Sequence, residues 1–98
     1  MKARDTRDTD ESSILAIRVH PQDNVAVVAA DVPAGSAVRL DDATTLRAIE
    51  VIARGNKVAL RPIPRGEAVI RYGEEIGTAT GDITAGQHVH THNMRRGE

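Results

Sequence analysis

The feature that most constrains the fold of this chain is a short glycine motif that occurs four times. Each copy has an aliphatic residue, two further residues, a glycine, two more residues and a valine. Ile63 of the third copy lies 31 positions after Val32 of the first, and the fourth copy has the same offset from the second. The motif therefore predicts an old duplication of a unit that contains two turns. The four copies are VPAGSAV at 32–38, IARGNKV at 52–58, IPRGEAV at 63–69 and ITAGQHV at 83–89.

Each copy of the motif predicts a tight turn followed by a short strand. A glycine can adopt the positive φ that such a turn needs, because it has no Cβ to clash with the backbone. Pro33 and Pro64 are expected at the second position of their turns, where the fixed φ of proline fits. The residues that follow alternate between polar and apolar, as in KVALR at 57–61, and this alternation indicates strands.

The remaining segments also favour short strands. Residues 14–30 are predicted to form a β-hairpin around the turn-forming PQD, and RYGEEIG predicts another turn around Gly73 to Glu75. Residues 43–53 are compatible with a helical turn, but their β-branched residues favour an extended chain. We therefore expect an all-β domain of many short strands with pseudo-two-fold character.

This domain is expected to span residues 13–94. Residues 1–12 mix charges of both signs, lack apolar periodicity and have no hydrophobic signal core, which is typical of a disordered tail. Residues 95–98 are expected to form a C-terminal tail.

The composition limits both the core and the partners of such a domain. Apolar residues make up 40% of the 98 residues, but Tyr72 is the only aromatic one. The core must then be built from Val, Ile, Leu and Ala, which favours thin layers and leaves little material to enclose a catalytic cavity. The net charge of −1 gives no electrostatic signature of nucleic-acid binding. The lack of cysteine fits a cytoplasmic protein without disulfides, and no apolar run approaches the roughly 18 residues of a membrane span.

Three of the four histidines lie at alternate positions near the end of the chain. His88, His90 and His92 belong to GQHVHTHN, residues 86–93. In an extended strand their side chains share one face, roughly 6.5–7 Å apart. This arrangement is suited to acid–base chemistry near neutral pH, or to metal ligation if the strand bends and a carboxylate contributes. We favour proton transfer or substrate contact, and a solvated polar strand face is the alternative.

Other candidate side chains lie at turns or just after them. Lys57 and Arg71 each follow a turn, where a cation could hold a substrate carboxylate, although a solvated face is the default interpretation. His20, Asp23 and Asn24 surround the PQD turn, and the last two could simply stabilise this turn through their own side chains.

No self-contained catalytic set accompanies these residues. The sequence has no Ser-His-Asp order, no phosphate-binding loop and no CxxC pair. Tyr72 could pack in the small core with its hydroxyl group in water.

The assembled segments resemble a known family. HPQDNVAVV, DVPAGSAV, GNKVAL and IPRGEAVIRYGEEIGTATGDITAGQHVHTHN are together similar to the N-terminal SAF-type domain of altronate and galactarate dehydratases. The resemblance covers about residues 14–93, and its most specific pieces are YGEEIGTAT and GQHVHTHN, in that order. It implies the β-clip fold, which agrees with the short strands and the pseudo-two-fold repeat.

The resemblance also implies a function. Full-length members of the family are hydro-lyases that eliminate water from hexonic or hexaric acids to give 2-keto-3-deoxy acids, with Fe²⁺ or Mn²⁺ as the suggested metal. Some relatives are split into a short SAF subunit and a large subunit, and one of these eliminates sulfite from sulfolactate. We therefore expect this chain to be a small subunit or first domain that binds a large dehydratase component and a sugar acid, and to be inactive alone. Three alternative functions stay open: a non-catalytic sugar-acid binding module, a structural β-clip domain, and the small subunit of an enzyme like the sulfolactate sulfo-lyase. A homo-oligomer is also left open.

The resemblance also implies roles for individual residues, but this sequence departs from the family pattern at two positions. Asn56 stands where the family pattern commonly has His, and Arg71 where it commonly has Lys, which leaves the substrate open. The ligands of any metal are also left open. The residues predicted to be catalytic are His88, His90 and His92, and those predicted to bind substrate are His20, Asp23, Asn24, Lys57, Arg71, Tyr72 and Asn93.

Overall fold

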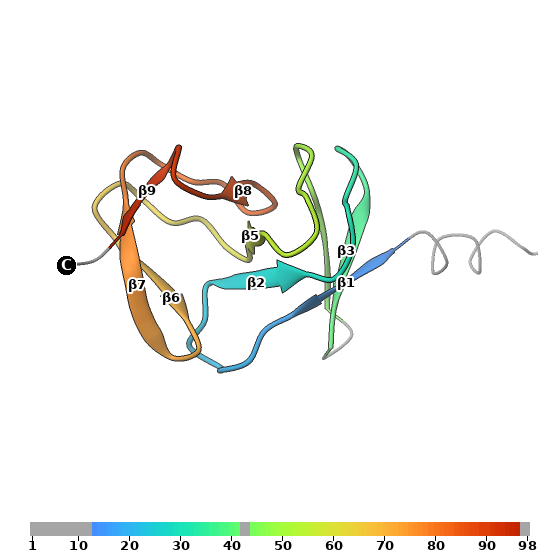
Figure 1. Ribbon diagram of the computed structural model, residues 1–98, viewed down its shortest axis with the longest axis horizontal. Helices are drawn as coiled ribbons and strands as arrows, with labels where there is room; N and C mark the ends of the chain where they lie inside the picture. Colours follow the sequence, from blue (N-terminus) through green and yellow to red (C-terminus); the bar gives the residue numbers. More distant parts are fainter. Residues whose placement is uncertain (1–12, 42–43, 97–98) are drawn as a thin grey trace, which may run out of the picture.

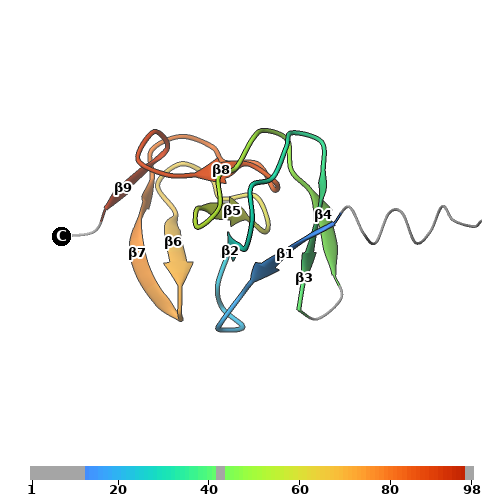
Figure 2. The ribbon, with the colours of Figure 1, turned by 45° about the vertical axis from the view of Figure 1, so that its right-hand side comes forward.

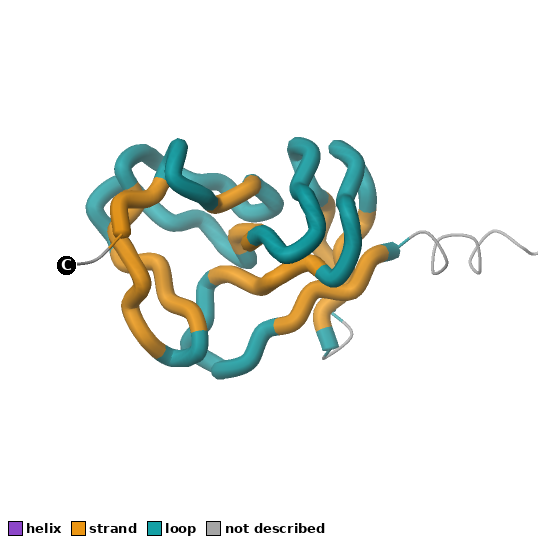
Figure 3. The backbone as a smooth tube through the Cα atoms, viewed as in Figure 1, coloured by secondary structure: helices purple, strands orange, loops and turns teal. Residues whose placement is uncertain are grey.

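The computed structural model describes residues 13–41 and 44–96, which form short strands connected by turns. Figure 3 shows strands and loops in this part of the chain, with no helix. The predicted all-β class is therefore confirmed, and the tail expected at residues 1–12 lies outside the described residues. The strands are β1 (Ile14–Ile17), β2 (Val25–Val28), β3 (Ala37–Leu40), β4 (Thr45–Arg47), β5 (Lys57–Ala59), β6 (Ala68–Arg71), β7 (Glu74–Ala79), β8 (His88–Val89) and β9 (Met94–Arg96).

The strands form two sheets. The larger has the order β4-β3-β1-β2-β5-β8, and it contains the predicted antiparallel hairpin of β1 and β2 together with a parallel pair of β1 and β3. The smaller is antiparallel, with the order β6-β7-β9. Figures 1 and 2 show the smaller sheet at one end of the molecule, β3 and β4 at the other, and β5 and β8 between them.

The boundary expected after residue 94 is wrong. Arg95 and Arg96 belong to β9 and pair with Thr78 and Gly77 of β7. The six-residue β7 has β6 on one edge, and its other edge is available for this last strand. A strand that begins just after a turn and carries two arginines has too little apolar pattern to be recognised from the sequence.

All four copies of the glycine motif form the same turn. Their glycines have φ between 85° and 89°, and the residue after each glycine donates its N–H to the carbonyl three positions earlier, at 2.9–3.1 Å. The predicted role of the glycines is confirmed, but the position of the prolines is wrong. Pro33 and Pro64 accept the turn hydrogen bond and so occupy the first position, where the fixed φ of proline suits the extended chain that enters the turn.

The duplication extends to the hydrogen bonds around the turns. Val32 and Ile52 exchange both backbone hydrogen bonds, and so do Ile63 and Ile83, which lie 31 positions further along. In each copy the glycine N–H donates to the carbonyl of one buried residue, and the N–H of that residue donates back to the residue after the glycine. We call these four partners the anchor residues. In the order of the motif copies they are Ala48, Val28, Ala79 and Ala59.

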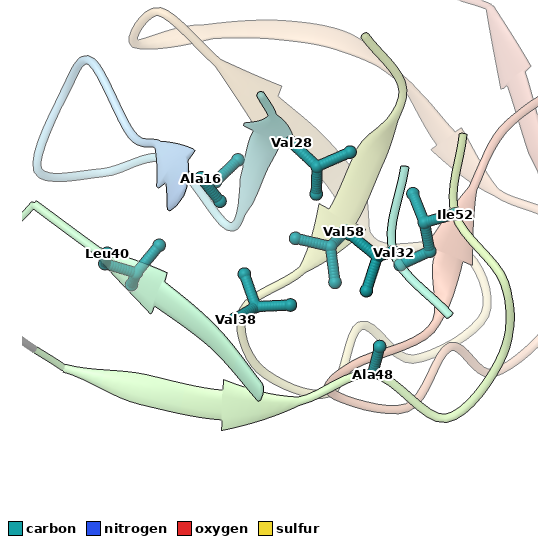
Figure 4. Close-up of a cluster of buried hydrophobic side chains, with 9 residues drawn as sticks. Ala16, Val28, Val32, Val38, Leu40, Ala48, Ile52 and Val58 are labelled. Carbon is teal, nitrogen blue, oxygen red and sulfur yellow. The ribbon is translucent and has the colours of Figure 1, made fainter. Parts of the chain in front are cut away.

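Two apolar clusters fill the interior. Figure 4 shows the first, in which small aliphatic side chains from the larger sheet and the first two turns point toward one another. Six of its members have a counterpart 31 positions later in the second cluster, so the core is duplicated with the turns. Each fully buried Val or Ile side chain in these clusters contributes about 1.5–3 kcal/mol. The second cluster consists of Val25, Ala59, Ile63, Val69, Ala79, Ile83, Val89 and Met94.

The position of Tyr72 differs from the expectation that it packs in the core. Tyr72 does not pack in the core, since 53% of it is exposed. The described part of the chain contains no helix with the length and hydrophobicity of a membrane span.

Gly86 should tolerate a side chain less well than Gly66. The two glycines have nearly the same positive φ, so alanine at either position is strained by about 1–2 kcal/mol. A Cβ at Gly86 would also overlap the carbonyl oxygen of Arg47, whereas a Cβ at Gly66 meets no atom within 4 Å. We expect Gly86→Ala to lower the free energy of unfolding by about 1–3 kcal/mol more than Gly66→Ala, measured by urea denaturation. Equal losses would show that the segment around Arg47 yields without cost.

Candidate functional site

The segment that carries three histidines bends instead of running straight. β8 ends at Val89, residues 90–93 form a turn, and β9 begins at Met94. The extended strand expected over this segment is therefore wrong beyond its first two residues. Asn93 holds the bend, because its Oδ1 accepts the N–H of His90 at 2.9 Å and its Nδ2 donates to the carbonyl of His88 at 2.8 Å.

The bend brings the three imidazole rings together. The ring centres of His88 and His90 are 5.5 Å apart with nearly parallel planes, and those of His88 and His92 are 5.2 Å apart. His88 is half-buried, whereas His90 and His92 are exposed. We call the three residues the histidine cluster. The separation expected for an unbent strand does not apply, because the turn folds His92 back onto His88.

The surroundings of His88 favour a neutral imidazole. Burial lowers its pKa, the nearby rings of His92 and His90 lower it further, and Glu50 acts in the opposite direction. The backbone N–H of His88 donates to Oε2 of Glu50 at 2.9 Å. Its Nε2 is buried and has no hydrogen-bond partner among the described residues. Leaving a buried polar atom unpaired costs about 1–3 kcal/mol.

The lowered pKa of His88 predicts how pH changes the stability of the fold. As the pH falls below about 6.5, the unfolded chain binds a proton at this residue before the folded chain does. The stability that this difference provides is therefore fully present above about pH 6.5 and is lost as the pH falls toward the lowered pKa. We expect His88→Gln to lose less stability between about pH 7.5 and pH 5 than His20→Gln, measured by urea denaturation. The same loss in both variants would contradict this assignment.

The histidine cluster is not a metal site by itself. Among residues 13–41 and 44–96, no group of three or more His, Cys, Asp or Glu side chains is arranged to hold a metal ion. The divalent metal that the resemblance implies would therefore need ligands from outside the described residues.

A second group of predicted residues lines a cleft between β5 and the smaller sheet. The cleft has a volume of about 200 Å³. Three of its residues are cations, and no carboxylate of the described residues forms an ion pair with any of them. Burial lowers the pKa of Lys57, and the charges of Arg71 and Arg96 lower it further. We call this feature the cationic cleft. Its lining residues are Lys57, Arg71, Tyr72, Glu74, Ile76, Met94 and Arg96.

Tyr72 lies at the rim of this cleft in an uncommon backbone conformation. Tyr72 and Gly73 connect β6 to β7 and have φ of 59° and 75°, so both central residues of the turn are left-handed. Asparagine or glycine is the usual residue at the first of these positions, and tyrosine is strained there. The guanidinium carbon of Arg71 lies 4.4 Å from the centre of the Tyr72 ring, so the ring holds the arginine by a cation–π contact.

Asp23 and His20 both contact the turn formed by Tyr72 and Gly73. The carboxylate of Asp23 accepts the N–H of Gly73 at 2.8 Å and the N–H of His20 at 3.1 Å. Burial alone would raise the pKa of Asp23, but these and other backbone hydrogen bonds more than offset that effect and lower it. The ring of His20 lies against Gly73, since a Cβ added there would meet it at 2.8 Å. The bond from the N–H of His20 is the local contact that was predicted for Asp23 in the PQD turn, whereas its bond to Gly73 was not predicted.

The side chain of Asn24 forms the same kind of hydrogen bonds with the backbone of β6 as the side chain of Asn93 forms with the histidine turn. Its Nδ2 donates to the carbonyl of Ala68 at 2.9 Å and its Oδ1 accepts the N–H of Ile70 at 2.8 Å. Both asparagines are buried, and each binds a carbonyl and an N–H two residues apart. The side chains of Asp23, Asn24 and Asn93 are thus engaged with the backbone, and their predicted substrate contacts stay predictions.

Two residues of these sites were missed by sequence reasoning. Arg96 was assigned to a tail, and only its pairing with Gly77 in β9 brings it to the cationic cleft. Glu50 lies in the connection between the first two motif copies, where no periodicity marks it. The amide hydrogen bond between Ile49 and the carbonyl of Gly86, at 3.0 Å, brings this connection beside the histidine cluster.

Comparison with known proteins agrees with these observations. Residues 14–97 match the altronate/galactarate dehydratase SAF domain. The chain belongs to this family. Altronate dehydratase of Escherichia coli (strain K12) is 51% identical over 80 residues, which are 81% of this chain and 16% of the relative. Altronate dehydratase of Bacillus subtilis (strain 168) is 34% identical over 79 residues, again 81% of this chain and 16% of the relative.

A shorter relative is also similar. The (2R)-sulfolactate sulfo-lyase subunit alpha of Paracoccus pantotrophus is 51% identical over 41 residues, which are 42% of this chain and 61% of that subunit. The family resemblance predicted from the sequence is thus confirmed. The chain spans only about 16% of the length of the altronate dehydratases that it matches.

Proposed function

We propose that this chain is the SAF component of a hydro-lyase that acts on a hydroxy acid of the altronate or galactarate type, together with a large catalytic component. The family match supports the reaction class, and the histidine cluster is the observation that carries a direct role for this chain. A base removes the proton from the carbon next to the carboxylate, and the hydroxyl group on the following carbon leaves as water. The resulting enol tautomerises to the 2-keto-3-deoxy acid.

In this proposal the exposed His90 and His92 exchange protons with the substrate, and the half-buried His88 supports their rings. Imidazole is suited to this role because its ordinary pKa lies near neutrality. The large component covers the cluster and excludes water, since two exposed rings on a surface turn cannot do so themselves. The isolated chain is therefore inactive in this proposal.

Replacing His90 or His92 by Gln should lower kcat of the assembled enzyme without weakening the fold. Loss of a proton-transfer group lowers the rate by about 10²-fold or more. Both side chains are exposed, so the free energy of unfolding should change by less than about 0.5 kcal/mol. Thr91→Ala, an exposed position in the same turn, is the matched control and should keep full activity. Full activity in all three variants would support the structural β-clip alternative.

A sulfo-lyase is the second candidate, and the sulfo-lyase subunit that is 51% identical over 41 residues favours it. Sulfolactate is also a hydroxy acid with a leaving group on the carbon after the one that loses its proton. The same elimination would release sulfite in place of water. An assay of the assembled enzyme for sulfite and for 2-keto-3-deoxy acid distinguishes the two candidates.

The large component should dock on a pair of exposed apolar residues beside the histidine cluster. Ile49 and Val51 are 54% and 66% exposed, and Glu50 between them accepts the N–H of His88. The internal repeat provides a control, because the residues 31 positions later are the polar Thr80 and Asp82. The fold therefore does not require apolar residues here. Since the altronate dehydratases are about six times longer than the matched segment, their remaining part is the partner that we propose for this surface.

Exchanging this pair for its repeat counterparts tests the docking surface. Ile49→Thr with Val51→Asp should leave the free energy of unfolding within about 0.5 kcal/mol, because both positions are exposed. Binding to the separately purified large component should weaken by about tenfold or more in isothermal titration calorimetry. Val19→Thr, which alters another exposed apolar residue, should bind as the wild type does. Unchanged binding of the exchanged pair would exclude this surface.

A further inference from the structure

We propose that the cationic cleft is the subsite that binds a carboxylate of the hydroxy-acid substrate, through Lys57, Arg71 and Arg96. The identity of the ligand rests on the proposed function. The site itself rests on the arrangement of side chains from β5, β6 and β9, three strands that are far apart in the sequence.

The charges that line the cleft are suited to an anion. Three cations and a single carboxylate, Glu74, line one small volume, and no carboxylate of the described residues forms an ion pair with any of the three cations. Lys57 is half-buried, and a partly buried charge normally has a partner. Burial and the two arginines lower its pKa, so an anion in the cleft would relieve an unfavourable interaction that already exists. Arg71 and Arg96 can bind a carboxylate in the bidentate manner of guanidinium groups.

The backbone conformation of Tyr72 is strained, which points to a functional role for its side chain. At φ of 59° tyrosine is less favourable than glycine by about 1–2 kcal/mol. Its ring does not repay this cost by burial, since it is largely exposed. What the ring does is hold the guanidinium of Arg71 at the rim of the cleft. Strain of this kind is typical of a binding site.

The size of the cleft limits what enters it. Its volume of about 200 Å³ lies below the roughly 300–1,000 Å³ of pockets that enclose a whole small-molecule ligand. One carboxylate end of a sugar acid therefore fits better than the entire molecule. Ile76 and Met94 line the same cleft and reduce contact with water, which strengthens an ionic interaction. Glu74 is the one lining residue that opposes an anion.

The cleft and the histidine cluster are neighbours. β5 pairs with β8, so that Val58, next to Lys57, lies opposite His88. The charge of Lys57 is close enough to lower the pKa of His88. Arg96 lies on β9, which begins directly after the turn that carries His90 and His92. A substrate held by one carboxylate in the cleft can therefore extend toward the groups proposed to transfer protons.

The test is a titration of the isolated 98-residue chain with galactarate, followed by ¹H–¹⁵N NMR. Galactitol, which has the same carbon skeleton but no carboxylates, is the control ligand. Galactarate should shift the amide signals of the cleft, and galactitol should not. Lys57→Met, Arg71→Met and Arg96→Met should each weaken galactarate binding by about tenfold, whereas Arg65→Met, a cation at a different cleft, should not.

Two further variants separate a binding role from a structural one. Tyr72→Gly should raise the urea midpoint, because it removes the backbone strain, and should still weaken galactarate binding by loosening Arg71. Glu74→Gln should strengthen binding. Signals that move equally with galactitol, or equal binding by the three Met variants and Arg65→Met, would overturn the proposed subsite. If the cleft does not bind galactarate but the assembled enzyme is an active hydro-lyase, only the subsite is refuted. If the cleft binds galactarate but the assembled enzyme eliminates neither water nor sulfite, only the proposed function is refuted.

Discussion

The glycine turn clamped to a buried anchor residue is the interaction on which the rest of this fold depends. In each clamp the glycine N–H donates to the carbonyl of the anchor residue, and the anchor N–H donates to the carbonyl of the residue after the glycine. Three of the four anchor residues are alanines, which let the two backbones approach closely. Hydrogen bonds of this kind fix the path of the chain at four places, so a core without phenylalanine or tryptophan has only to fill the two small volumes that remain.

The duplication gives the two candidate sites a common origin in the fold. Lys57 and His88 are 31 positions apart and each lies two residues after a turn glycine, Gly55 or Gly86. Both side chains are half-buried, and burial is the first cause of the lowered pKa of each. The repeat therefore provides two equivalent positions, at the start of β5 and of β8, where a titratable group is partly removed from water. Their neighbours then differ, since arginines surround the lysine and imidazoles surround the histidine.

The sequence was sufficient for features that are encoded within a few residues. The turn glycines, the first hairpin and the all-β class follow from local motifs, and the alternation of His88, His90 and His92 marked them as a group. The turn at residues 90–93 was not predictable, because alternation is also the pattern of a strand and the deciding contacts are made by the buried amide of Asn93. Arg96 and Glu50 reach their sites only through pairing across the fold, which local patterns do not contain.

The two buried asparagines explain how so thin a domain can hold functional side chains in fixed positions. Asn24 and Asn93 each substitute for a missing strand partner by binding a carbonyl and an N–H two residues apart. One fixes β6, which ends at Arg71 just before the strained Tyr72, and the other fixes the turn of His90 and His92. The scaffold contacts are therefore buried, while the side chains of Tyr72, His90 and His92 stay exposed. Such groups are well placed but not desolvated, and electrostatic and proton-transfer effects are strong only where water is excluded. A domain of this design is suited to present half of an active site to a second protein surface that closes it.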